Sequence, residues 1–109
     1  AWRIEIDGQS IVITGSFNNS KDLAATFAKD ADALVVSHAI PENSRGVLRD
    51  LYARPSQLGR VANQADARMM ILGHRNVRTR GRESLSRNAI EENYDGTILF
   101  ANDGECWGL

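Results

Sequence analysis

The sequence has one cysteine, two histidines and two prolines, and it has no long apolar run. One cysteine excludes a disulfide framework and a zinc site built from cysteines alone. No stretch approaches the roughly 18 apolar residues that a membrane helix needs, and no basic-then-apolar leader is present. A net charge of -1 gives no overall field that would attract nucleic acid or a membrane. We therefore expect a soluble protein, cytoplasmic rather than secreted, with no nucleic-acid or membrane partner; a start at Ala1 leaves open a lost leader or upstream domain.

The composition is that of an ordinary globular domain. The 109 residues are 42% apolar and 25% charged, which is enough apolar material for one core and predicts a single domain over residues 1–109. Eleven of the thirteen basic residues are arginine, and five of them fall between Arg75 and Arg87. Arginine suits bidentate binding of carboxylate or phosphate, although an exposed, solvated loop is the plainer interpretation of such a run.

Apolar periodicity predicts the secondary structure. Residues 2–6 and 10–14 alternate around Asp7-Gly8, a strong hairpin-turn dipeptide. Ser20 is placed to cap a helix over residues 21–29. Three further helices are expected: a short one over 47–52 in a loop-rich stretch, one beginning at Pro55, and one over 83–94. Strands are expected at residues 34–36, 69–72, 97–101 and, at the end, 105–107.

This order, β-β-α-β-α-β-α-β-β, is an α/β domain with a mixed sheet and about three main helices. Its central strands are apolar on both sides, so both faces of the sheet need cover. Helices on both faces would make a closed monomer. Helices on one face would leave the other to a second sheet, from another chain or a missing half.

Several segments resemble the C-terminal half of the metallo-β-lactamase-fold hydrolases, nearest to their arylsulfatase- and ribonuclease-Z-like branches. These segments cover nearly the whole chain in the family's order: IVITGS at 11–16, ADALVVSH at 31–38, the helix and strand over 55–75, and YDG through ANDG over 94–104. The family fold is a four-layer αββα sandwich made of two similar halves. The resemblance implies that this chain is one half of it.

The resemblance also implies a comparison with the family's dinuclear zinc site. That site needs a His-x-His-x-Asp-His motif from the other half, and the motif is absent here. Ser16 stands where the bridging aspartate would sit, and a neutral hydroxyl cannot bridge two dications. His74 matches the last histidine, which leaves one ligand where a catalytic zinc needs three. We expect no catalytic residue and no cofactor in the chain alone, with zinc bound only if other ligands are supplied.

Five residues are candidate site residues. His74 is a candidate metal ligand, with a hydrogen-bonded loop histidine as the alternative. His38, Arg75, Ser16 and Asn18 are candidates for a pocket rim, because ligands gather at the carboxyl ends of parallel strands. The alternatives are an exposed loop position for His38 and turn-shaping for Asn18. Cys106 is expected to be a small buried group, and Trp2 and Trp107 to pack in a core or an interface.

Three functions follow, in order of preference. The first is a non-catalytic half of a metallo-β-lactamase-like fold that pairs with a twin or a complementary half through its open sheet face. The second is the C-terminal portion of a zinc-dependent hydrolase of an ester, phosphoester, sulfate ester or lactam, whose other ligands come from elsewhere. The third is a small-anion-binding module that uses His74, Arg75 and neighbouring arginines.

Overall fold

A computed structural model describes all residues, 1–109, as one five-stranded sheet with helices packed against it. The strands lie in sequence order, β1-β2-β3-β4-β5; β1 is antiparallel to β2, and β2 to β5 are parallel. The elements are β1 (Trp2–Ile6), β2 (Gln9–Ile13), α1 (Ala24–Phe27), β3 (Ala33–Ser37), α2 (Val47–Leu51), α3 (Pro55–Ala65), β4 (Met69–Gly73), α4 (Glu83–Glu91) and β5 (Thr97–Phe100). The predicted mixed α/β fold is confirmed.

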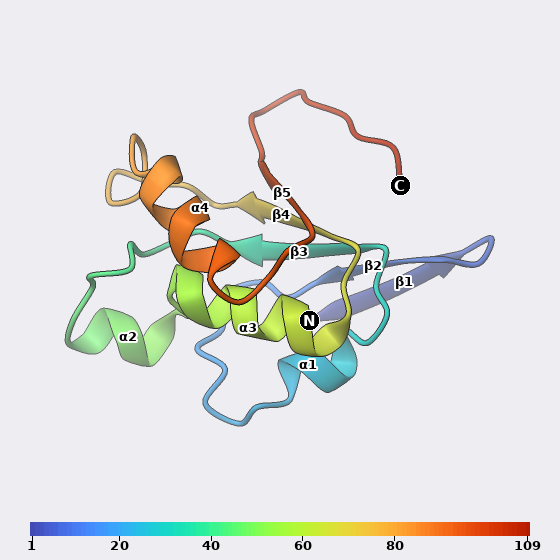
Figure 1. The fold of residues 1–109 in the computed structure, drawn as a ribbon, viewed down its shortest axis with the longest axis horizontal. Helices are drawn as coiled ribbons and strands as arrows, with labels where there is room; N and C mark the ends of the chain where they lie inside the picture. The colour runs from blue at the N-terminus through green and yellow to red at the C-terminus, as the bar shows by residue number, and fades with distance from the viewer.

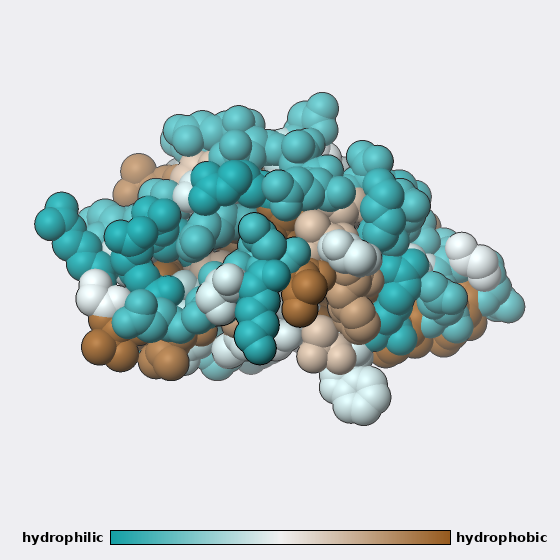
Figure 2. All heavy atoms as spheres, turned by 90° about the horizontal axis from the view of Figure 1, so that it is seen from below, coloured by the Kyte–Doolittle hydropathy of each residue, from teal (hydrophilic) through white to brown (hydrophobic).

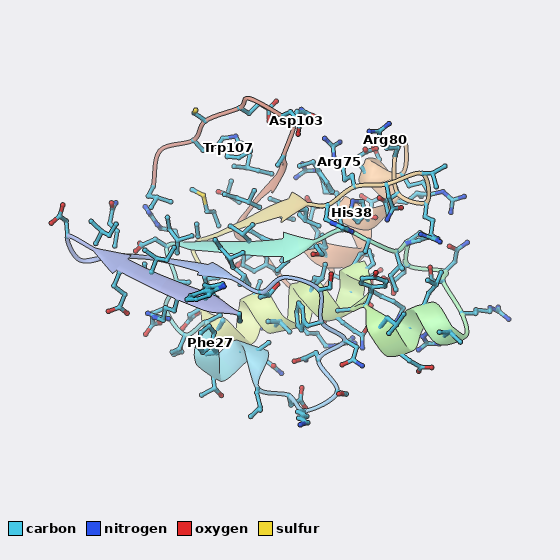
Figure 3. The ribbon with its side chains drawn as sticks, turned by 180° about the vertical axis from the view of Figure 1, so that it is seen from behind. Phe27, His38, Arg75, Arg80, Asp103 and Trp107 are labelled. Atoms are coloured by element: carbon cyan, nitrogen blue, oxygen red, sulfur yellow. The ribbon has the colours of Figure 1, made fainter.

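The sequential strand order places all the helices on one face of the sheet. Each parallel strand lies one step further along, and right-handed crossovers that advance in one direction return on the same side. Figure 1 shows the helices gathered on that side, and Figure 3, from behind, shows the strands in front of them. Of the two arrangements that the sequence left open, the structure has the one with an uncovered face.

The core lies between this helical layer and the sheet. Alternate strand residues point into it, which is the period expected of a strand, and the buried faces of α3 and α4 meet them. Its members include Val12, Leu34, Val36, Met70, Leu72 and Ile98 from strands and Leu58, Val61, Ala62 and Ile90 from helices.

Three predicted elements differ from the structure. Residues 105–107 form no strand, and the chain after β5 is irregular to its end. The first helix covers only Ala24–Phe27, because its N-cap is Leu23, which makes no capping hydrogen bond, and not Ser20. The last helix ends at Glu91, earlier than predicted, and the Asn93 N–H bonds the Ile90 carbonyl in the tighter i→i−3 pattern of a helix end.

The segment after β5 returns across the uncovered face. The Gln9 side chain lies on the side of β2 opposite the buried Val12, and its Nε2 donates to the Leu109 carbonyl at 3.4 Å. The segment must therefore pass from β5 back toward β2 (Figure 1). Cys106 is exposed on it, so the prediction that this residue is buried is wrong, and Trp107 remains 38% exposed.

Candidate site at the carboxyl edge of the sheet

The polar candidate residues follow the carboxyl ends of the parallel strands. Ser16 comes after β2, His38 immediately after β3, and His74 with Arg75 after β4. Backbone bonds hold this edge together: Thr14 N–H donates to the Val35 carbonyl, and His38 N–H donates to the Gly73 carbonyl. The fold therefore brings the candidate residues to one edge, as parallel strands require.

His38 is a buried polar residue, 1% exposed, so the expectation of an exposed loop position is wrong. Its Nε2 lies 2.7 Å from the Ser86 Oγ on α4, and its ring packs on Phe100. Nδ1 has no partner. Burial lowers the pKa of His38 to about 4, with nearby Arg75 acting in the same direction and Glu83 against it. A neutral imidazole bonded to a hydroxyl that is itself buried joins the end of β3 to α4, while the rim role of His38 stays a prediction.

His74 is the opposite case: an exposed residue with a left-handed backbone, φ 54°. Ser16 at the end of β2 is also exposed. Nowhere in the chain do three or more histidine, cysteine, aspartate or glutamate side chains come together as a possible metal site. The donors present therefore do not fit a dinuclear zinc centre, since a catalytic zinc takes three protein ligands.

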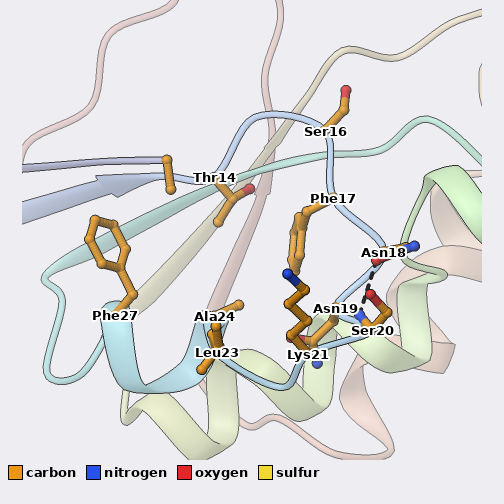
Figure 4. Close-up of a pocket in the computed structure, with 11 residues that line it drawn as sticks. Thr14, Ser16, Phe17, Asn18, Asn19, Ser20, Lys21, Leu23, Ala24 and Phe27 are labelled. Carbon is orange, nitrogen blue, oxygen red and sulfur yellow. Dashed lines mark hydrogen bonds between the residues drawn. The ribbon is translucent and has the colours of Figure 1, made fainter.

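A surface pocket of about 410 Å³ opens beside Ser16 and Asn18. Its lining mixes apolar and polar side chains, as Figure 4 shows: Thr14, Phe17, Asn19, Ser20, Lys21, Leu23, Ala24 and Phe27 complete it, together with Ala1. Asn18 donates from Nδ2 to the Asp50 carbonyl and accepts at Oδ1 from Ser20 N–H at 3.0 Å. The turn-shaping role of Asn18 is therefore confirmed, while its binding role stays a prediction.

Arg75 connects three segments of the chain. Its Nη1 donates to Glu83 Oε1 at 2.9 Å, and its Nη2 donates to the Ala101 carbonyl at 2.6 Å and to Asn102 Oδ1. Its guanidinium is thus occupied by the start of α4 and by the segment after β5 (Figure 3). The sequence predicts Arg75 at a pocket rim. In the structure, its guanidinium group donates to acceptors within the protein.

The comparisons with known proteins bear on this fold. No family model and no curated protein matches the sequence. Among solved structures, the metallo-beta-lactamase fold protein YhfI from Bacillus subtilis superposes with a TM-score of 0.75 at 20% identity, over 96% of this chain and 42% of YhfI. The chain has the fold of part of a metallo-β-lactamase-fold protein. It spans less than half of YhfI, and identity this low shows the fold alone.

Sequence reasoning missed two features of this edge. One is the buried pair of His38 and Ser86, which are 48 positions apart in the sequence. The other is a cluster of three arginines, Arg45, Arg49 and Arg54, that lines one surface pocket. The signal for the second is present in the sequence, since the three arginines lie within ten positions, but the run from Arg75 to Arg87 is denser in arginine.

Proposed function

We propose that this chain is a non-catalytic half of a metallo-β-lactamase-like fold that pairs with a second copy of itself through its open sheet face. One observation carries the proposal: β1 turns its apolar residues away from the protein's own helices. Ile4 pairs with Ile11, and Trp2 pairs with Ile13, on the uncovered side. Arg3, on the other side, donates to the Phe27 and Lys29 carbonyls of the helical layer.

This arrangement is the reverse of what a free-standing hairpin needs. An antiparallel pair with one solvated face puts polar residues toward water. Here Trp2 is 74%, Ile4 42% and Ile6 64% exposed on the face without helices. Brown atoms line the lower right margin of Figure 2, beneath the hairpin. Exposed apolar surface of this kind marks a place where something packs.

The strand residues of the open face include no charged side chain. The strand residues that share the register of Ile4 and Ile11 are Trp2, Ile6, Gln9, Ile13, Ala33, Val35, Ser37, Met69, Ile71, Gly73, Thr97 and Leu99. The segment after β5 crosses part of the face, and Ile71 near its centre is only 9% exposed. The part that stays open is the hairpin. A twofold pair would bury that patch against the same patch of its partner.

The proposal has two further parts. The fold is nearest to the arylsulfatase- and ribonuclease-Z-like branches, and the chain alone catalyses no reaction. A zinc-dependent hydrolase whose other ligands come from elsewhere is the second candidate, favoured by His74, which stands exposed at the end of β4. Metal analysis of the purified chain separates the two. Clearly substoichiometric zinc supports the first candidate, and a full equivalent of tightly bound zinc supports the second.

Sedimentation velocity over a range of concentrations tests the pairing. The wild type is expected to approach twice its 12.0 kDa mass as concentration rises. Ile4→Lys places a charge on the open face and is expected to remain a monomer. Glu5→Gln changes the net charge by the same amount on the other side of β1 and is expected to pair like the wild type. A wild type that stays at 12.0 kDa throughout, with a native circular dichroism spectrum, contradicts the proposal.

A further inference from the structure

Three arginines line a shallow pocket of about 440 Å³ on the loop between β3 and α3. Arg45, Arg49 and Arg54 share it with Glu42, Asn43 and Ser44, and it has no apolar lining residue. The loop lies on the side of the molecule where α2 is labelled in Figure 1. Three guanidinium groups and one carboxylate leave a local excess of positive charge in a chain whose net charge is -1.

The one carboxylate in this pocket is already occupied. Glu42 accepts from the Ser56 Oγ at 2.6 Å and from the Ser56 backbone N–H at 2.9 Å, at the beginning of α3. Its nearest approach to an arginine is 3.9 Å, from Arg54 Nη1. Glu42 therefore serves the helix start, and it neutralises the arginines only weakly.

The arginines are only weakly paired within the protein, since the one ion pair among them is the 3.9 Å contact of Arg54 with Glu42. Arg54 is held partly buried, with 24% of its side chain exposed, and its Nε is buried without any acceptor. Arg45 and Arg49 are exposed and take part in none of the ion pairs of the chain. Asp50, the next carboxylate along, lines a neighbouring pocket with Arg49. This differs from Arg75, whose Nη1 and Nη2 both donate to acceptors of the protein.

We propose that this pocket binds a doubly charged oxyanion, namely a phosphate or sulfate group. Planar guanidinium forks match the oxygens of such groups in pairs. The exposed guanidinium groups of Arg45 and Arg49 and the partly buried one of Arg54 have more N–H donors than the protein uses. Asn43 and Ser44 add neutral polar groups to the same pocket. The pocket also lies apart from the open sheet face, so this inference does not depend on the pairing of two copies.

Titration of the ¹⁵N-labelled chain with inorganic phosphate, at constant ionic strength set by chloride, tests the site by amide shifts. Saturable shifts confined to residues 42–56 are expected. Arg49→Gln is expected to weaken phosphate binding by about tenfold, the effect of one charge-assisted hydrogen bond. Arg80→Gln removes an exposed arginine from the other arginine-rich loop and is expected to leave the affinity unchanged.

Parallel titrations with glycerol phosphate and with a short DNA duplex distinguish the sources of the oxyanion. Saturable binding of either phosphate or glycerol phosphate at this pocket supports the proposal. The probe that binds with the higher affinity indicates whether the natural ligand is a free phosphate or a phosphate ester. Equal losses in Arg49→Gln and Arg80→Gln, shifts that chloride reproduces, or binding of the duplex alone would overturn it, since each indicates diffuse attraction to a basic surface. Arg49 is exposed, so its replacement is expected to leave the fold intact.

Discussion

Ile4 and Ile11 face each other across the β1–β2 pair, on the side of the sheet that no helix covers. Their neighbour Trp2 stands at the same face and is 74% exposed in the single chain. Pairing of two copies through this face would bury the indole. In a Trp107→Phe variant, Trp2 is the only tryptophan left, and its emission maximum is expected to shift to shorter wavelength as protein concentration rises. An emission spectrum that does not change between dilute and concentrated samples would argue against burial at an interface.

Acid should destabilise the fold through His38. Burial lowers the folded-state pKa of this imidazole to about 4 from its ordinary value of 6.5. The unfolded chain therefore binds the extra proton first, and stability is lost as the pH falls from 6.5 toward 4. The loss from this group is on the order of 3 kcal/mol. Urea unfolding at a series of pH values measures it.

The matched variants for this measurement are His38→Gln and His74→Gln. The first keeps an amide that can bond the Ser86 hydroxyl and has nothing to protonate, so the dependence on pH between 4 and 6.5 is expected to flatten. The second replaces an exposed histidine and is expected to keep the wild-type slope. The same slope in all three proteins would mean that His38 does not control the acid response.

Arg75 is expected to anchor the segment after β5. Replacement by methionine removes the ion pair with Glu83 and the bonds to Ala101 and Asn102, for a loss of about 2 kcal/mol in unfolding free energy. Lysine has one compact charge in place of a fork, so Arg75→Lys should recover only part of that loss. Hydrogen exchange should rise in residues 101–109 in both variants. Unchanged exchange there would show that the segment is held by other contacts.

Gly59 lies at a close approach of α3 to α4. A Cβ at this position would lie 2.6 Å from the Ile90 carbonyl oxygen. Replacing an exposed helical glycine by alanine usually raises the stability of a protein. Gly59 is buried, and Gly59→Ala should lower the free energy of unfolding by about 2 kcal/mol because the two helices must separate. Gly73→Ala, where nothing lies within 4 Å, is the control and should change stability little. Thermal unfolding in both variants decides this; a stabilised Gly59→Ala would contradict the packing.

The strands and α3 could be predicted from the sequence because their patterns are strong. Alternating residues mark β1 and β2, continuous apolar runs mark β3 and β4, and Pro55 marks the beginning of α3. The short first helix could not be predicted, since Ser20 offers a capping hydroxyl that the structure does not use. The prediction of a final strand was wrong for a similar reason. Residues 105–107 alternate plausibly, but no neighbouring strand is there to pair with them.

The site was harder to predict because its residues meet only in three dimensions. No local pattern relates His38 to Ser86, and the burial of a histidine that the sequence places at a pocket rim depends on residues far away in the chain. Similarly, the acceptors of Arg75 lie 8 to 27 positions away in the chain. The order of the helices and strands and their apolar periodicity were enough to predict the fold class. The role of each polar side chain depends on which partners the folded chain brings to it.

The most direct test of the pairing claim is methyl cross-saturation between isotope-labelled and unlabelled copies of the chain. If two copies join through the open face, magnetisation should pass to the methyl groups of Ile4, Ile6 and Ile13, and scarcely to Ile98 in the core. Transfer that misses all three isoleucines, or that enters through residues of the helical layer, would contradict the account.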